Sequence, residues 1–174
     1  MISHEPPERA IVLRTDRLVL TPLSRLDESE HAQASGNPDD APRATGSAES
    51  QWQQHGFGPW AIRDRCDNSF LGSAELRYAG DGIDGIAPTE VEAGWWVTES
   101  RRNHGIAAEA MRAAIADLWN RAGVESLTAY IADGGNEPSC RLAAGLGFTV
   151  RGPGRGRFGE PMTVYELRRH TVET

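Results

Sequence analysis

The residues best placed to do chemistry lie where the segment TESRRNHGIAAEA passes from a polar turn into a long helix-forming stretch. Two arginines and a histidine gather in this turn, and Gly105 follows them directly. A helix leaves backbone N–H groups unpaired in its first turn, and its dipole adds about half a positive charge there. A glycine at this point lets an anion approach the backbone without a Cβ in the way. The segment therefore predicts an anion site that suits a pyrophosphate, made of Arg102, Asn103, His104, Gly105, Ile106 and Ala107.

This anion site differs from the two common nucleotide-binding motifs. The chain has no GK[ST] sequence here, and the glycine spacing of a dinucleotide-binding turn is absent. Taken alone, the stretch fits a solvated polar loop between a strand and a helix equally well, because short motifs often match by chance. The rest of the chain has to decide between the two interpretations.

Length and composition favour one folded domain. The chain has 174 residues, of which 39% are hydrophobic and 25% charged, and this is enough to bury a core. The net charge of −7 argues against nucleic acid as a partner, since phosphate contacts need a basic surface. The same field favours a cationic substrate. The 18 lysine-plus-arginine residues are all arginines, so a Schiff base on an enzyme lysine is excluded.

The sequence carries no signal for a metal site, a disulfide framework or a membrane. The two cysteines, Cys66 and Cys140, show no ligand spacing, which fits a reducing cytoplasm. No apolar run is long enough to span a bilayer, and the N-terminal segment lacks the features of a secretory signal. We therefore expect a cytoplasmic protein without a metal, with one domain over residues 1–174 and flexible tails at 1–10 and 170–174.

Strand-like and helix-like patterns alternate along the chain. Strands are expected at 11–22, 59–65, 69–79, 89–97, 125–132, 148–152 and 162–169. Residues 26–58 are polar, and the clearest helix there covers 47–56. Apolar residues recur at helical spacing from Ala107 to Trp119, and Gly123 ends that helix. A shorter helix is expected at 136–147. This order predicts a mixed α+β domain with an antiparallel first half and a crossover helix.

Two of these segments resemble the landmarks of a known superfamily. RNHGIA resembles the (Gln/Arg)-x-x-Gly-x-(Gly/Ala) signature of the GNAT acyl-CoA N-acyltransferases, and NEPSCRLAAGLGF resembles their Asn-x-x-Ser-…-Gly-Phe segment. TDRLVLTPL, HGFGPWAIRDR…FLGSAEL and VYELRR are similar to the RimJ/RimL type. The resemblance covers roughly residues 12–169. Several weak motifs in the right order are far stronger than any one of them.

The resemblance implies a GNAT-like α+β fold, with a mostly antiparallel sheet of six to seven strands and about four helices. It also implies transfer of an acetyl group from acetyl-CoA to a primary amine by direct attack. The pyrophosphate is expected on the backbone N–H groups of 103–107, with Arg102 adding charge. The pantetheine arm is expected beside Trp96 and Val97 and in contact with Asn136, and a backbone N–H near Val97 is the expected oxyanion donor.

The resemblance suggests Glu92 as the base that takes a proton from the amine, directly or through a water. The alternative is a structural glutamate paired with an arginine. Many relatives carry a tyrosine acid on the following helix, but this chain has Ala143 at that position. Ser139 is the nearest replacement, although a serine there can equally bond the backbone of the first helical turn.

Three functional interpretations stay open at this stage. The first is an acetyltransferase whose acceptor is a protein N-terminus or a small amine. The second is a non-catalytic acyl-CoA-binding or regulatory module, because the tyrosine is missing. The third is a structural or interaction domain that does not bind coenzyme A. Homodimers are common in the superfamily, and the resemblance allows one here.

Overall fold

The computed structural model describes residues 11–170. The tail expected at 1–10, and all but His170 of the tail expected at 170–174, therefore lie outside the described residues. The strands are β1 (Leu13–Arg14), β2 (Leu18–Pro22), β3 (Trp60–Asp64), β4 (Phe70–Tyr78), β5 (Val91–Val97), β6 (Ser126–Ala132), β7 (Thr149–Arg155) and β8 (Pro161–Arg168). The helices are α1 (Glu28–Ser35), α2 (Ala41–His55), α3 (Ile106–Arg121) and α4 (Glu137–Leu146). The expected α+β fold is thus confirmed.

The strands form one sheet in the order β1-β2-β3-β4-β5-β6-β8-β7. Every neighbouring pair is antiparallel except β5 and β6, which run parallel because α3 carries the chain across between them. These two strands pair at a single position, Glu92 with Thr128. Beyond it they diverge, so the last residues of β5 face a gap in the middle of the sheet.

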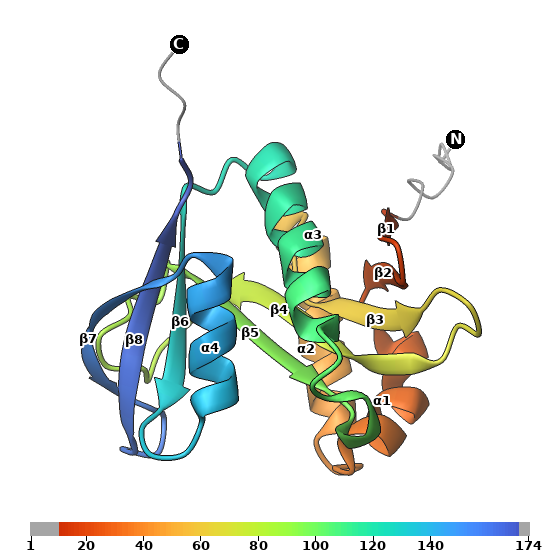
Figure 1. The fold of residues 1–174 in the computed structure, drawn as a ribbon, viewed down its shortest axis with the longest axis horizontal. Coiled ribbons are helices and arrows are strands. Elements are labelled where there is room, and N and C mark those ends of the chain that lie inside the picture. Colours follow the sequence, from red (N-terminus) through yellow and green to blue (C-terminus); the bar gives the residue numbers. More distant parts are fainter. Residues whose placement is uncertain (1–10, 171–174) are drawn as a thin grey trace, which may run out of the picture.

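The two faces of the sheet carry different helices. Figure 1 shows α3 and α4 in front of the sheet and α2 behind it. Helix α3 buries Met111, Ala114 and Leu118 against the sheet, and these residues repeat at the spacing of one helical face. On the other face, α1 and α2 pack against each other and against β4 and β2. None of the helices within residues 11–170 is long and apolar enough to cross a membrane.

The expectation of a single strand at 11–22 is wrong, and so is the count of six to seven strands. The segment forms β1 and β2, joined by a turn in which the Leu18 N–H donates to the Thr15 hydroxyl and the Thr15 N–H donates to the Leu18 carbonyl. A threonine side chain that bonds the backbone locally offers the chain an alternative to an extended strand. The sheet within residues 11–170 therefore has eight strands.

The polar segment 26–58 is more helical than its composition suggests. The helix expected at 47–56 begins at Ala41, with a proline in its first turn, and ends before Gly56. Proline is favoured there because its missing N–H has no helical partner to lose. Ala41, Thr45 and Ala48 are buried on one face of the helix, and this narrow stripe of small residues is a weak signal against a polar background.

Candidate active site

The mouth of α3 is shaped by two residues with left-handed backbone conformation. Gly105 precedes the helix at φ 74°, and Asn103 lies at φ 62°. No side chain caps the helix, so the N–H groups of its first turn are left for another partner. A left-handed conformation is unusual for a residue other than glycine, although asparagine tolerates it best. The loop therefore turns twice within three residues and exposes its backbone.

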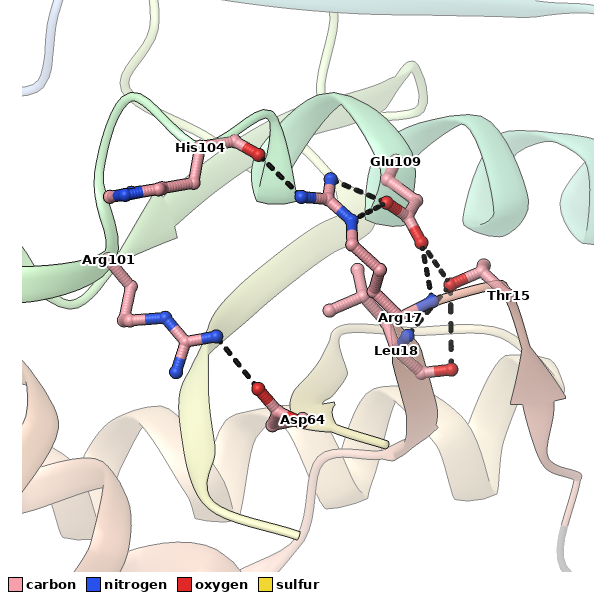
Figure 2. Close-up of polar contacts among 7 residues, drawn as sticks. All are labelled: Thr15, Arg17, Leu18, Asp64, Arg101, His104 and Glu109. Atoms are coloured by element: carbon pink, nitrogen blue, oxygen red, sulfur yellow. Dashed lines mark hydrogen bonds and ion pairs between the residues drawn. The ribbon is translucent and has the colours of Figure 1, made fainter. Parts of the chain in front are cut away.

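Arg17 fastens this loop to the turn between β1 and β2 (Figure 2). Its guanidinium donates to the His104 carbonyl oxygen at 2.8 Å and to the Glu109 carboxylate at 2.7 Å. The Thr15 hydroxyl and the Arg17 N–H donate to the same carboxylate at 2.6 and 3.1 Å. Burial raises the pKa of Glu109, but these hydrogen bonds outweigh it and hold the pKa below its ordinary value. The carboxylate thus stays charged near neutral pH, and the contacts of Arg17 with Glu109 and His104, which we call the Arg17 clamp, stay formed.

A second set of contacts holds the start of the loop. Arg101 pairs with Asp64 of β3 at 2.7 Å (Figure 2). The Arg102 Nε donates to the carbonyl oxygen of Val97 at 3.1 Å, and the His104 Nδ1 lies 2.7 Å from the Arg102 carbonyl oxygen. These contacts tie the loop to β3 through Asp64 and to the end of β5 through Val97, and they close its own turn between Arg102 and His104.

A cavity of about 450 Å³ lies between the mouth of α3, the end of β5 and the start of α4. It brings together nine of the residues that the sequence predicts for the site: Trp96, Val97, Arg102, Asn103, Gly105, Ile106, Ala107, Asn136 and Ser139. His104 is not among its lining residues, because the imidazole turns back onto the Arg102 carbonyl oxygen. His104 contributes to the loop through its backbone carbonyl, which Arg17 binds.

The asparagine that begins α4 is free to bind a ligand. Asn136 occupies the position before the helix, but its side chain makes no capping hydrogen bond. Ser139 lies one turn into α4 and lines the same cavity. Ala143 is fully buried in the core. At the position where many relatives carry a tyrosine, this chain thus has a small residue that packs in the core.

The last residue of β5 points its backbone N–H into the gap. The Thr98 N–H donates to the Leu71 carbonyl oxygen, and antiparallel pairing alternates between bonded and non-bonded positions. In the observed register, Val97 stands opposite Gly72 at a non-bonded position. The N–H of Val97 therefore faces away from β4 and toward the gap, where β6 has diverged and offers it no partner.

A smaller cavity of about 260 Å³ fills this gap between β5 and β6. Glu92, Trp95, Tyr130, Asn136 and Ser139 are among the residues that line it. It shares Trp95, Asn136 and Ser139 with the cavity at the mouth of α3. The gap therefore joins the carboxylate of Glu92 to the α3 and α4 side of the sheet.

Glu92 is a buried carboxylate with one free oxygen. Its residue is 5% exposed. Oε1 lies 3.7 Å from the Arg77 guanidinium, while Oε2 is buried without a hydrogen-bond partner. Burial raises the pKa of Glu92, and the charges of Arg77 and Arg157 oppose this rise without cancelling it. A carboxylate with a raised pKa and a free oxygen is suited to accept a proton from a neighbouring group.

A third cavity, of about 490 Å³, opens on the face covered by α1 and α2. It reaches Glu92 and shares Trp95, Trp96 and Arg102 with the cavity at the mouth of α3. Its walls carry the carboxylates Asp40, Glu75 and Glu92 and the guanidiniums Arg43, Arg77 and Arg102. Because these charges balance, the cavity itself does not strengthen the preference for a cationic ligand that the net charge suggests.

His31 of α1 is a site residue that sequence reasoning missed. It is 4% exposed, lines the third cavity and packs edge-on against Trp96 with ring centroids 5.1 Å apart. Its Nδ1 is buried without a partner. Burial lowers the pKa of His31, against the pull of Glu75 and Asp40, so the ring is neutral at pH 7. A lone histidine in a polar segment carries no sequence signal for this position.

Within residues 11–170, no group of three or more histidine, cysteine, aspartate or glutamate side chains is arranged to hold a metal ion. The polar groups that line the three cavities are backbone N–H groups, amides, hydroxyls, carboxylates, guanidiniums and an imidazole. Such a set can bind an anion, polarise a carbonyl group and move protons.

Comparison with known proteins agrees with this geometry. The family model described as acetyltransferase (GNAT) domain matches residues 17–149. Among curated proteins, no sequence relative matches the chain. A solved protein assigned to the GNAT acetyltransferases, from Bordetella pertussis, is 28% identical with a TM-score of 0.78, over 90% of this chain and 98% of that one.

Two further solved structures share the fold at lower identity. The ribosomal-protein-S5-alanine acetyltransferase from Vibrio fischeri is 10% identical with a TM-score of 0.72, over 94% of this chain and 100% of that one. The microcin C7 self-immunity acetyltransferase MccE, solved with acetyl-CoA and AMP, is 13% identical with a TM-score of 0.67, over 89% and 94% of the two chains. At these identities the likeness concerns the fold alone.

Proposed function

The chain belongs to the acetyltransferase (GNAT) domain family, and we propose that it is an N-acetyltransferase of the RimJ/RimL type that moves an acetyl group from acetyl-CoA to a primary amine. The observation that carries the proposal is that the three cavities, which lie on the two sides of the sheet and in the gap between β5 and β6, share lining residues at this gap. A donor on the α3 side and an acceptor on the α1 and α2 side would meet at this gap. The acceptor is a protein N-terminus or a small amine.

The residues at the mouth of α3 fit coenzyme A. When bound, acetyl-CoA supplies the activated acetyl group as a thioester. The free N–H groups of Gly105, Ile106 and Ala107 would receive the pyrophosphate, and Arg102 would add positive charge. The uncapped amide of Asn136 and the backbone of β5 that faces the gap suit an arm that carries amide groups. A Cβ on Gly105 would make only one ordinary contact, at 3.4 Å from Arg17, so glycine is favoured here by its φ of 74°, which L side chains rarely adopt.

The residues of the gap supply the remaining chemistry. The Val97 N–H, which faces the gap, is the donor we assign to the developing oxyanion. Glu92 takes the proton that the amine loses as it attacks, directly or through a water, because its free Oε2 and raised pKa suit that role. The hydroxyl of Ser139 is placed to hydrogen-bond the sulfur. Each role uses a group of this chain that lines a cavity or faces the gap.

The acceptor would enter through the cavity beneath α1 and α2. Its walls combine the aromatic ring of Trp96, the neutral ring of His31 and the carboxylate of Glu92. The two unpartnered polar atoms, His31 Nδ1 and Glu92 Oε2, suit an amine that carries a second hydrogen-bonding group. A chain terminus with its first peptide group has this form, and so do many small polar amines.

A thiol-release assay with a panel of amines tests the proposal. Acetyl-CoA is incubated with the protein and with unblocked peptides, polyamines or amino sugars, and free thiol is recorded over time. The matched control for each peptide is the same sequence with its N-terminus blocked. We expect thiol release with at least one free amine and a matching acetylated product by mass spectrometry. Binding of acetyl-CoA without turnover on any amine would contradict catalysis and leave an acyl-CoA-binding module.

The homodimer that the resemblance allows and the expected cytoplasmic location belong to the same proposal. Light scattering checks the first, since a dimer has twice the 18.9 kDa of one chain. Fractionation of the native host checks the second, and recovery in the soluble cell interior is the expected result.

A further inference from the structure

Tyr130 lines the gap cavity together with Glu92, Asn136 and Ser139. It lies on β6 two residues after Thr128, which is the sole partner of Glu92 in the pairing of β5 with β6. Side chains two apart on a strand share a face, so Tyr130 stands on the same side of β6 as Thr128, at the point where the strands diverge. Its side chain is half-buried and packs against the cluster around Ile83 and Val164.

The proposed reaction needs a proton donor at this gap. A thiolate leaves when the amide forms, and the position where relatives place a tyrosine is Ala143, which is fully buried. The hydroxyl groups that line the gap cavity within the described residues belong to Tyr130 and Ser139. A tyrosine has an ordinary pKa of about 10, close to the value of about 8.5 for a thiol. A serine hydroxyl is a far weaker acid, so Tyr130 is the better-matched donor.

We propose that Tyr130 is the catalytic acid that protonates the leaving thiolate, and that Glu92 returns the proton to Tyr130. This inference rests on the proposed acetyltransferase function and names the acid of that same site. It moves the donor from α4 to β6. Ser139 keeps the lesser role of a hydrogen-bond partner to the sulfur.

The protons and bonds of this scheme balance. An ammonium loses one proton to solvent before it can attack. The nitrogen lone pair of the amine then forms the bond to the acetyl carbon, the carbon–sulfur bond breaks, and its electron pair leaves on sulfur. The second proton of the nitrogen passes to Glu92. Tyr130 gives its hydroxyl proton to the sulfur and takes the proton from Glu92, so both side chains end as they began.

The surroundings of Tyr130 keep its hydroxyl protonated. Burial raises the pKa of Tyr130, and the charge of Glu92 raises it further, while Arg77 and Arg157 oppose both effects. A raised pKa makes an isolated transfer to a thiolate uphill. Transfer coupled to the proton on Glu92 removes that cost, because a carboxylic acid is the stronger acid of the two. The pair is therefore more effective than either group alone.

The test compares Tyr130→Phe with the matched variant Tyr165→Phe in the thiol-release assay. Tyr165 also loses one hydroxyl, but that hydroxyl points to the Cys140 sulfur at 3.5 Å and not into the gap. We expect kcat of Tyr130→Phe to fall on the order of 100-fold, as is common for loss of a general acid. The KM for acetyl-CoA and the melting temperature should stay at wild-type values, and Tyr165→Phe should keep wild-type kcat.

Each outcome decides the question. Wild-type kcat in Tyr130→Phe, with active wild-type protein, would overturn the role of Tyr130 and leave the proposed function standing. Absence of activity in the wild type with every amine would overturn both. If Tyr130→Phe melts well below the wild type, 3-fluorotyrosine at position 130 replaces it. A donor role then requires the alkaline fall of kcat to move to lower pH, and an unmoved alkaline fall would contradict it.

Discussion

Arg17 and Glu109 lie 92 residues apart in the chain and form an ion pair in which two guanidinium nitrogens approach the carboxylate at 2.7 and 2.6 Å (Figure 2). The same guanidinium binds the His104 carbonyl oxygen. A single side chain thus ties the first turn of α3 and the loop before it to the edge of the sheet. The backbone groups that would receive the pyrophosphate keep their positions because of this tie.

Replacement of this arginine should weaken acetyl-CoA binding without direct loss of a ligand contact. In Arg17→Ala the His104 carbonyl oxygen loses its guanidinium donor, and the Glu109 carboxylate keeps only the Thr15 hydroxyl and the N–H of residue 17. The end of the loop next to α3 then loses its tie to the sheet edge. We expect the Kd for acetyl-CoA to rise on the order of 10-fold, equivalent to about 1.4 kcal/mol, in calorimetric titration. The control is Arg168→Ala, which removes the same charge from a side chain that is 77% exposed. An equal rise of Kd in both variants would refute the clamp.

The buried carboxylate sets the acid limit of activity. Since burial raises the pKa of Glu92, its proton-accepting form is lost at a higher pH than in an exposed glutamate. The rate should therefore fall as pH drops through this raised pKa. Above it, once ionisation of the amine is taken into account, the rate should reach a plateau that ends only at the alkaline pH where Tyr130 ionises. Glu92→Gln should lower kcat about 10²- to 10⁴-fold and abolish this acid limb. A pH profile of kcat for both proteins checks it, and an unchanged acid limb in Glu92→Gln would contradict the assignment.

The approach of β4 to β5 depends on a glycine. A Cβ on Gly72 would lie 2.9 Å from the Val97 Cα and closer still to the Trp96 carbonyl oxygen, and φ is 155°. Gly72→Ala should lower the free energy of unfolding by about 1–3 kcal/mol, as overpacking does, measured by urea unfolding. Gly152→Ala is the matched control, because Gly152 has φ 157° but no neighbour within 4 Å of the added Cβ. Equal losses in the two variants would show that backbone strain and not the close approach is responsible.

The helix mouth could be predicted from sequence because its signal is local. The spacing of the residues from Arg102 to Ala107 fixes a turn, a glycine and a helix start within six positions, and the structure places these elements there. The order of strands and helices followed for the same reason, since hydrophobic periodicity is read within each element. His104 shows the limit of local reasoning, because its side chain turns away from the cavity while its carbonyl serves the loop.

Features that depend on contacts between distant segments could not be read in advance. His31 enters the site only because α1 packs over β4 and Trp96. Tyr130 gains its position only because β5 and β6 diverge after one paired position. The turn at Thr15 is hidden in an alternating pattern that continues through it, and its stabilisation comes partly from Glu109. In each case the contacting residue is far away in sequence, so the spacing of residues within one segment does not predict the contact.

A calorimetric titration with acetyl-CoA tests the central claim most directly, on the wild type, Gly105→Glu and Gly123→Glu. Both glycines are left-handed, with φ 74° and 65°, and lie at opposite ends of α3, so the two variants share backbone strain and added charge. Only the first places a carboxylate at the mouth of α3. We predict that the wild type and Gly123→Glu bind acetyl-CoA and that folded Gly105→Glu does not. Absence of binding by the wild type, or equal binding by both variants, would contradict the assignment of the α3 mouth as the coenzyme A site.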